Sequence, residues 1–333
     1  MALDFLRIAK KGPIVIEAMR TFFRIIISGI FLAAGLLLSG CKTKPVPVPE
    51  EPLPLLGSSL IFDGITADDP GLLHLSFSLG IGNPFPSSGR VLIESWQVEL
   101  NGQTLTHNSY LPKENKEGFN LVLSGNDEYL LKPAVSRQGD KPIPSSASFP
   151  LLLDMNVEAL SLMGHAPYDD YAVNLILDLD ISFDSAPPQK VRVSGIARFP
   201  GVQAPVFSIT SIAILKAELI NTRFRVGLKI TNPNPYPVEL SAFGYELYGN
   251  GRLWADGVEK NILRVNGKSS LAGNLFLIMN FINMKRDLLD QIINLEDVNY
   301  RFAGDALVST SVEYLPKFKT EFDLSGYSPV YDN

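Results

Sequence analysis

Alternation of apolar and polar residues is the feature that most restricts the fold of this chain. Three segments alternate in this way: His74–Ile81, Leu175–Phe183 and Phe224–Ile230. Successive side chains of a strand point to opposite faces, so a period of two is typical of antiparallel strands with one buried face. Only Met284–Leu295 has the spacing of an amphipathic helix. We therefore predict an all-β chain with one short helix near its C-terminal end.

Short segments of the chain occur twice, in the same order, which predicts an internal repeat. In each pair the segments share apolar spacing and turn residues. We infer two copies of one fold, at residues 58–200 and 205–328, with the first copy longer around His165–Pro188. The pairs are Leu79–Pro86 with Leu228–Pro237, Trp96–Gly102 with Tyr245–Gly251, Leu151–Asn156 with Leu275–Asn280, and Val191–Ala197 with Tyr300–Ala306.

A strand that ends in Asn-Pro pairs and is followed by an aromatic strand with Asn-Gly resembles one known family. This is the late embryogenesis abundant type 2 (LEA type 2) family, which overlaps the water-stress and hypersensitive-response (WHy) domain. Ile230–Gly251 is the better match, and Ile81–Gly102 is a degenerate one. The motif residues are Asn83, Pro84, Phe85 and Pro86 in the first copy, and Asn232, Pro233, Asn234, Pro235, Tyr236, Pro237, Asn250 and Gly251 in the second.

These motif residues have structural roles that follow from their chemistry. Proline lacks an N–H and ends a strand, and asparagine bonds nearby backbone groups in a turn. Asn-Gly suits a tight hairpin with positive φ. The resemblance implies two tandem antiparallel β-sandwiches, similar to fibronectin type III, with about seven strands each. It is a fold signature, so function has to be argued from a site.

The N-terminal region predicts a lipoprotein signal. Arg20 and Arg24 precede the uncharged stretch Ile25–Leu38, which is shorter than the roughly 20 residues of a membrane-spanning helix. The tripeptide Leu38, Ser39, Gly40 before Cys41 resembles the bacterial lipobox, in which the cysteine is acylated. Residues 1–40 are thus expected to be a signal peptide, with Met19 as the expected true start. The alternative is a short buried helix that ends in a core cysteine.

Residues 41–57 are expected to be the acylated cysteine and a proline-rich, extended tether. A proline-recognition ligand is the alternative for this segment. The mature chain is then held at a membrane through Cys41, because two or three acyl chains anchor firmly. Lys42 after the cysteine resembles an outer-membrane signal, so we expect that location in a cell with two membranes.

Composition excludes several classes of function. The net charge of −6 gives no general basic face for nucleic acid, and the chain has one cysteine and three histidines. We therefore expect no cofactor, no metal, no nucleic-acid partner and no disulfide within the chain. Solvated side chains are the expected state of His74 at the start of a strand and of His107 and His165 in loops. There is no Gly-x-Ser-x-Gly elbow, and no catalytic residue is assigned.

Two groups of aspartates were weighed as cation ligands. Asp178, Asp180 and Asp184 alternate along a predicted strand, so a solvated strand face is the expected state. Asp63, Asp68 and Asp69 are expected in a loop with Gly64 and Gly71, where a weak cation site is the alternative. A pair of catalytic carboxylates that acts on a glycosidic bond would give the same sequence pattern as these aspartates, so that alternative stays open.

An apolar segment of the second copy is the candidate for ligand binding. The structural interpretation is a central strand followed by a helix that closes the sandwich. The functional interpretation is an apolar groove or a membrane-facing patch. Trp96 is expected in a core and Trp254 partly exposed. The residues of the candidate segment are Leu275, Phe276, Leu277, Phe281, Leu288, Leu289 and Ile292.

Three functions remain open. The resemblance implies a non-enzymatic, monomeric envelope protein for desiccation or osmotic stress or for envelope maintenance, with weak lipid or protein partners. The alternatives are a lipid- or apolar-ligand-binding or transfer lipoprotein, and an envelope scaffold or adhesin.

Overall fold

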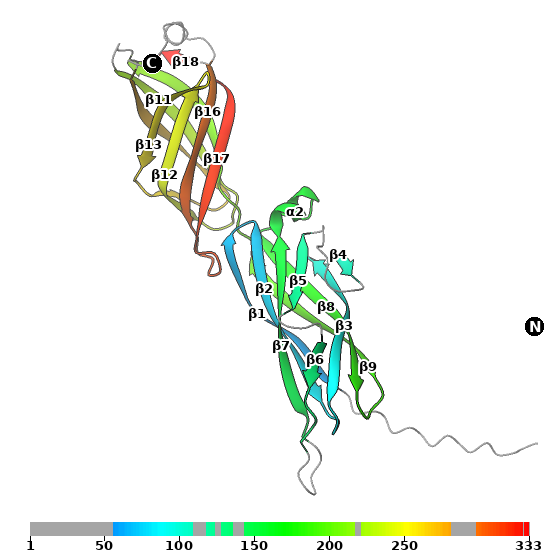
Figure 1. The fold of residues 1–333 in the computed structure, drawn as a ribbon. Coiled ribbons are helices and arrows are strands. Elements are labelled where there is room, and N and C mark those ends of the chain that lie inside the picture. Colours follow the sequence, from blue (N-terminus) through cyan, green and yellow to red (C-terminus); the bar gives the residue numbers. More distant parts are fainter. Residues whose placement is uncertain are drawn as a thin grey trace, which may run out of the picture. The chain divides into compact units, whose positions relative to one another are not determined.

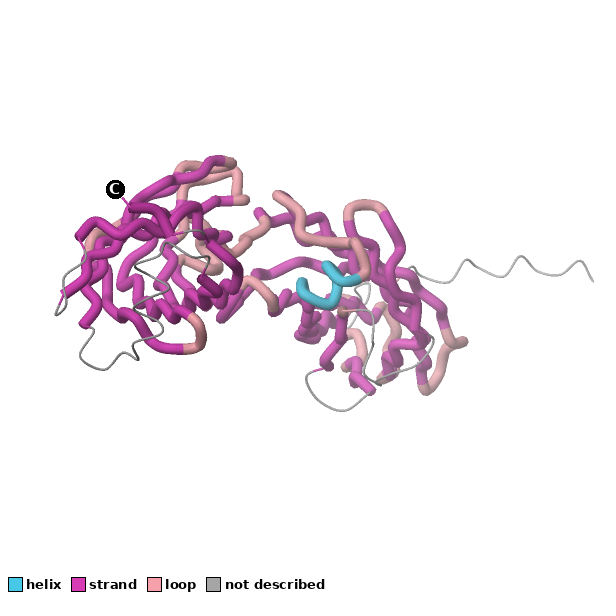
Figure 2. The backbone as a smooth tube through the Cα atoms, turned by 90° about the horizontal axis from the view of Figure 1, so that it is seen from above, coloured by secondary structure: helices cyan, strands magenta, loops and turns pink. Residues whose placement is uncertain are grey.

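The structure is a computed structural model that describes residues 56–108, 118–123, 128–135, 143–216, 221–280, 298–328 and 330–332. The predicted signal peptide, Cys41, most of the tether and the predicted helix Met284–Leu295 lie outside these residues. Figure 1 shows two β-sandwiches, and Figure 2 shows that strands make up most of the described chain. The prediction of an all-β fold is confirmed.

The first sandwich consists of two antiparallel sheets around one core. Its interior contains only residues between Leu60 and Phe199. One sheet has the order β1-β2-β7-β5, and the other β4-β3-β8-β9 with β6 also paired to β3. The strands are β1 (Gly57–Asp69), β2 (Leu72–Asn83), β3 (Gly89–Leu100), β4 (Gln103–Asn108), β5 (Phe119–Leu123), β6 (Glu128–Leu131), β7 (Ser145–Asn156), β8 (Asp170–Phe183) and β9 (Gln189–Pro200).

The second sandwich repeats this topology around a separate core between Val202 and Phe322. Its sheets have the orders β15-β11-β10-β18 and β13-β12-β16-β17, with β14 also paired to β12. The strands are β10 (Val206–Lys216), β11 (Asn221–Asn232), β12 (Val238–Gly249), β13 (Arg252–Glu259), β14 (Leu263–Val265), β15 (Ser269–Asn280), β16 (Val298–Ser309), β17 (Lys317–Ser328) and β18 (Val330–Asp332).

The alternating segments lie on β2, β8 and β11, with their apolar side chains inward. On β8, the inward side chains from Leu175 to Ile181 are at most 1% exposed. Burial of a leucine or isoleucine side chain contributes about 1.5–3 kcal/mol, so a one-residue shift in register would lose most of this core.

The structure corrects two details of the prediction and adds a helix. The added helix, α2 (Val157–Leu162), lies in the first sandwich, where Asn156 Oδ1 caps it by accepting the Ala159 N–H at 2.8 Å. Strand β18 is parallel to β10, whereas the predicted sandwiches are antiparallel.

The two segments of the fourth repeat pair lie on strands that are not equivalent in the two sandwiches. Val191–Ala197 lies on β9, whereas Tyr300–Ala306 lies on β16, the counterpart of β8. Neighbouring strands of one sheet share the same alternation, so the pattern did not distinguish them.

Candidate functional site

The first asparagine of each Asn-Pro motif is a buried backbone clamp. Asn83 and Asn232 are 0% exposed and end the equivalent strands β2 and β11. Asn83 Nδ2 donates to the carbonyls of Ser87 and Lys132, both at 2.8 Å. Asn232 Nδ2 donates to those of Tyr236, Val265 and Asn266 at 2.7–3.2 Å. Each side chain thereby joins its turn to the end of β6 or β14.

The second motif position differs between the copies. Phe85 is 8% exposed, and its ring centroid lies 4.6 Å from that of Phe183, so it closes the core as expected. Asn234 instead holds the backbone of Gln203 through two hydrogen bonds. Tyr236 Oη donates to the Gly201 carbonyl at 2.6 Å, and burial raises the pKa of this phenol well above its ordinary value. The double Asn-Pro motif thus holds the segment that leads into β10.

The Asn-Gly turns are hairpins that also tie two strands together. Asn101 and Asn250 have φ of 49° and 48°, and the glycines that follow them are also positive, as in a tight hairpin turn. Asn101 Oδ1 accepts the Ala172 N–H at 2.8 Å, and Asn250 Oδ1 accepts the Asn299 N–H at 3.2 Å. Asn101 therefore connects its hairpin to the start of β8, and Asn250 connects its hairpin to the start of β16. The role of these motif residues is to stabilise the fold.

The apolar candidate segment divides into an inner and an outer face. Leu275 and Leu277 are 8% and 3% exposed and belong to the core, whereas Phe276 and Ile278 are 67% and 63% exposed on the outer face of β15. Phe281, Leu288, Leu289 and Ile292 lie outside the described residues. Arg225 of β11 lies opposite Phe276, and Arg223 lies opposite Ile278. These four residues, Arg223, Arg225, Phe276 and Ile278, form what we call the β15 patch.

A cleft of about 220 Å³ opens beside this segment, on the inner side of β15. Its floor is apolar, and Glu259 is the charged residue among those that line it. We call it the β15 cleft. Its lining residues are Leu228, Ile230, Glu259, Leu263, Leu271, Ala272, Gly273, Asn274 and Leu275. Of these residues, the sequence prediction named only Leu275. An alignment of the two copies just before the third repeat pair would have shown that Gly273 aligns with a phenylalanine of the first copy.

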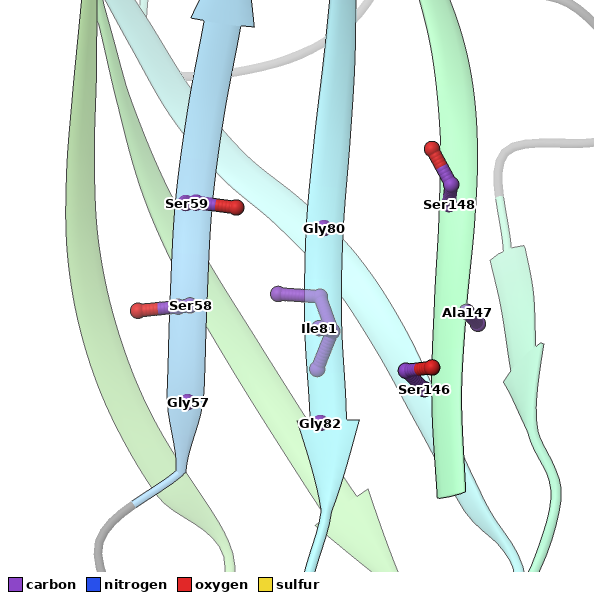
Figure 3. Close-up of a pocket in the computed structure, with 9 residues that line it drawn as sticks. All are labelled: Gly57, Ser58, Ser59, Gly80, Ile81, Gly82, Ser146, Ala147 and Ser148. Atoms are coloured by element: carbon purple, nitrogen blue, oxygen red, sulfur yellow. The ribbon is translucent and has the colours of Figure 1, made fainter. Parts of the chain in front are cut away.

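A larger depression lies on the outer face of β1, β2 and β7. It has a volume of about 560 Å³, and its walls are glycine, serine, alanine and one isoleucine (Figure 3). Ser59, Gly80 and Ser148 stand side by side across the three strands. None of the residues that line it is charged, and they provide neither a nucleophile–base pair nor a set of metal ligands.

The aspartates make ion pairs and turns. Asp178 accepts from Arg192 Nε at 2.7 Å and from Ser95 Oγ at 2.8 Å, so this aspartate is paired rather than simply solvated, and Asp184 follows the end of β8. Asp63 and Asp69 lie on β1, not in the predicted loop, because β1 extends to Asp69, which caps the turn by accepting the Gly71 N–H at 2.6 Å. Within the described residues, no three His, Cys, Asp or Glu side chains converge on a metal position.

The three histidines lie on different elements of the first sandwich. His74 Nδ1 lies 2.6 Å from Asp154 Oδ1 on the outer face of its sheet, so it is partnered rather than fully solvated. His165 lies in a loop as predicted, but His107 lies on β4 because the strand runs on to Asn108. No described helix is long and apolar enough to cross a membrane.

The two tryptophans mark the two cores. Trp96 is 5% exposed, as predicted, but Trp254 is 4% exposed and stacks on Phe224 with ring centroids 5.6 Å apart. The expectation of partial exposure for Trp254 is wrong because Gly249, on the neighbouring strand, leaves space for the indole. A Cβ at Gly249 would overlap that ring.

Comparisons with known proteins give only distant matches. No family model and no curated protein matches the chain. A protein from Archaeoglobus fulgidus of known structure is 20% identical over 38% of this chain and 97% of its own, with a TM-score of 0.23. The periplasmic chaperone SfaE is 10% identical over 84% and 99%, with a TM-score of 0.21. A Bacteroides uniformis β-glucuronidase 2 mutant is 8% identical over 75% of this chain and 26% of the enzyme, with a TM-score of 0.20. Such low values give no information on activity.

Proposed function

We propose that this chain is a non-enzymatic lipoprotein of the bacterial cell envelope that protects the cell during desiccation or osmotic stress, or maintains the envelope. Cys41 is the proposed anchor, and the outer membrane is the proposed location in a cell with two membranes. The two sandwiches are the proposed LEA type 2-like units. The observation that carries the proposal is that the first asparagine of the motif and the Asn-Gly turn make equivalent hydrogen bonds in both copies, as a family that shares a fold signature would require.

A deletion strain tests the stress role. We expect lower survival after drying and osmotic shock than in the parent strain, and recovery when the complete gene is returned. The matched control returns the gene with Cys41→Ser, which leaves every residue of both sandwiches unchanged and removes the acylation point. Survival equal to the parent in the deletion strain would contradict the stress role.

Lipid binding is the second candidate, and the β15 patch favours it. Phe276 and Ile278 are exposed apolar side chains whose cross-strand neighbours are Arg225 and Arg223, and a combination of apolar and basic residues suits acyl chains and anionic headgroups at a lipid surface. The test is organic extraction and native mass spectrometry of the chain purified in mild detergent. We expect about one retained lipid per chain, and its loss in the Phe276→Ser, Ile278→Ser double variant. A lipid-free mass for the unaltered chain would exclude this candidate.

A further inference from the structure

The two sandwiches differ at one position of the strand that borders the β15 cleft. Phe149 of β7 pairs with Leu79 of β2, and Gly273 of β15 pairs with Leu228 of β11. Leu79 and Leu228 occupy the same place, four residues before the buried Asn83 and Asn232. Gly273 is therefore the counterpart of Phe149, so the second sandwich lacks a ring that the first one has.

The residue that lies against Phe149 in the first sandwich also has a different counterpart in the second sandwich. In the first sandwich, Tyr129 of β6 lies against Phe149, with ring centroids 4.3 Å apart. Tyr129 pairs with Val91, and its counterpart Leu263 of β14 pairs with Leu240, which stands at the same distance from the buried asparagine. Leu263 and Gly273 both line the β15 cleft. The cleft is thus the space that two rings in contact, tilted by 33° to each other, fill in the first sandwich.

Among the described residues, no strand pairs with the second edge of β15, beside the cleft. In the first sandwich β5 pairs with β7 over Leu151–Met155 and ends the sheet. In the second sandwich β15 is the last strand of its sheet among the described residues. An unpaired strand edge presents backbone donors and acceptors that an extended chain can use.

The size and the rim of the cleft restrict its occupant. A volume of about 220 Å³ lies below the range of about 300–1,000 Å³ typical of small-molecule sites, but it accommodates a single ring. The half-buried carboxylate of Glu259 at the rim favours a cation nearby. Residues directly opposite each other on antiparallel strands have Cβ atoms about 4.5–5.5 Å apart, and an aromatic residue opposite an edge glycine covers it.

We propose that the β15 cleft is a docking site for an extended segment of a partner protein, which pairs with β15 and places an aromatic side chain opposite Gly273. The ring occupies the position that Phe149 occupies in the first sandwich, and a Lys or Arg of the same segment lies near Glu259. This binding site is independent of the desiccation role proposed above, and it differs from the β15 patch because it uses the inner side of the strand.

Two substitutions distinguish binding in the cleft from binding on the outer face of β15. A Cβ added at Gly273 meets no atom within 4 Å, so Gly273→Phe can place its own ring in the cleft and close it. Ser270→Phe adds the same ring three residues away, on the outer face of β15 and outside the residues that line the cleft. It is the matched control. Gly273→Leu is a second, smaller blocking variant, and thermal unfolding of each variant verifies that it folds.

The experiment uses the full chain in lipid nanodiscs and a phage-displayed library of random heptapeptides, with binding of selected peptides measured by fluorescence anisotropy. We expect enriched peptides with one Phe, Tyr or Trp and a nearby Lys or Arg, and at least tenfold weaker binding when the aromatic residue is changed to Ala. Gly273→Phe should weaken binding at least tenfold, and Ser270→Phe less than twofold.

Three outcomes would overturn the proposal. The first is a selection without enrichment of aromatic residues. The second is equal binding by the folded Gly273 variants and the unaltered chain. The third is a lipid that co-purifies with the unaltered chain and is lost in Gly273→Phe but not in Ser270→Phe, because the occupant would then be a lipid.

Discussion

The side chain of Asn234 pairs with the backbone of Gln203 in the way one peptide group pairs with another. Its Oδ1 accepts the Gln203 N–H at 2.7 Å, and its Nδ2 donates to the Gln203 carbonyl at 2.8 Å. Asn234 is 0% exposed, so both bonds lie away from bulk water. The second asparagine of the double motif therefore holds the chain that leads into the second sandwich.

Replacement of Asn234 by Ala is expected to lower the free energy of unfolding of the second sandwich by about 1–3 kcal/mol, because two backbone groups lose their partners. Urea unfolding followed by tryptophan fluorescence in a Trp96→Phe background measures this, since Trp254 is then the only tryptophan and lies in that core. The exposed Asn261→Ala is the control and should change stability by less than about 0.5 kcal/mol.

Asn232→Ala and Asn83→Ala are each expected to destabilise their own sandwich by about 2–4 kcal/mol, because a buried clamp between a turn and a neighbouring strand is lost. Trp254 reports on the Asn232 variant, and Trp96 reports on the Asn83 variant in a Trp254→Phe background. The exposed Asn120→Ala is the control. Equal stability of the clamp variants and the unaltered chain would show that these bonds are not structural.

Two glycines of the second sandwich should respond in opposite directions to the same change. Gly249→Ala is expected to cost about 1–3 kcal/mol, because the added methyl group overlaps the Trp254 ring. Gly273→Ala is expected to be neutral or to stabilise by up to about 1 kcal/mol, because a strand glycine gains a side chain in open space. Thermal unfolding compares the two, and a larger loss for Gly273→Ala would contradict this assignment of space.

The buried phenol of Tyr236 predicts how stability depends on alkaline pH. Burial raises its pKa in the folded state above the ordinary value of 10.0. Its contribution to stability is therefore fully present below pH 10 and is lost as the pH rises towards the folded-state pKa. Tyr236→Phe should make the alkaline decline of unfolding free energy shallower above pH 10, and at neutral pH it should cost about 0.5–1.5 kcal/mol for the lost bond to Gly201.

Urea unfolding at several pH values between 8 and about 11.5 measures this decline. Tyr327, which is 78% exposed, provides the matched control, and Tyr327→Phe should leave the curve unchanged. If the unfolding free energy of Tyr236→Phe declined above pH 10 as steeply as that of the unaltered chain, the argument would be contradicted.

The parts of this fold that follow local rules could be predicted from the sequence. Alternation along Leu175–Phe183 identified the inward face of β8, because a strand has a strict period of two. The Asn-Pro motif identified the ends of β2 and β11, because proline stops pairing. The role of Asn234 towards Gln203 could not be predicted, since the two residues are distant in sequence and meet only in the folded chain.

The remaining features depend on contacts between strands. Trp254 is buried because Gly249 on the neighbouring strand leaves room for it, and neither residue alone indicates this. Helix α2 is too short to show a clear helical period. The β15 cleft results from the absence of a ring at Gly273, and the cleft became visible only when the two sandwiches were compared strand by strand.

Mass spectrometry of the N-terminal peptide of the membrane-extracted protein tests the central claim, a lipid-anchored envelope protein, most directly. The account predicts a mature chain that begins at Cys41 and carries two or three acyl chains. It also predicts that Cys41→Ser releases the protein from the membrane fraction. A chain that retains residues before Cys41, or an unmodified Cys41 in the membrane-bound protein, would contradict it.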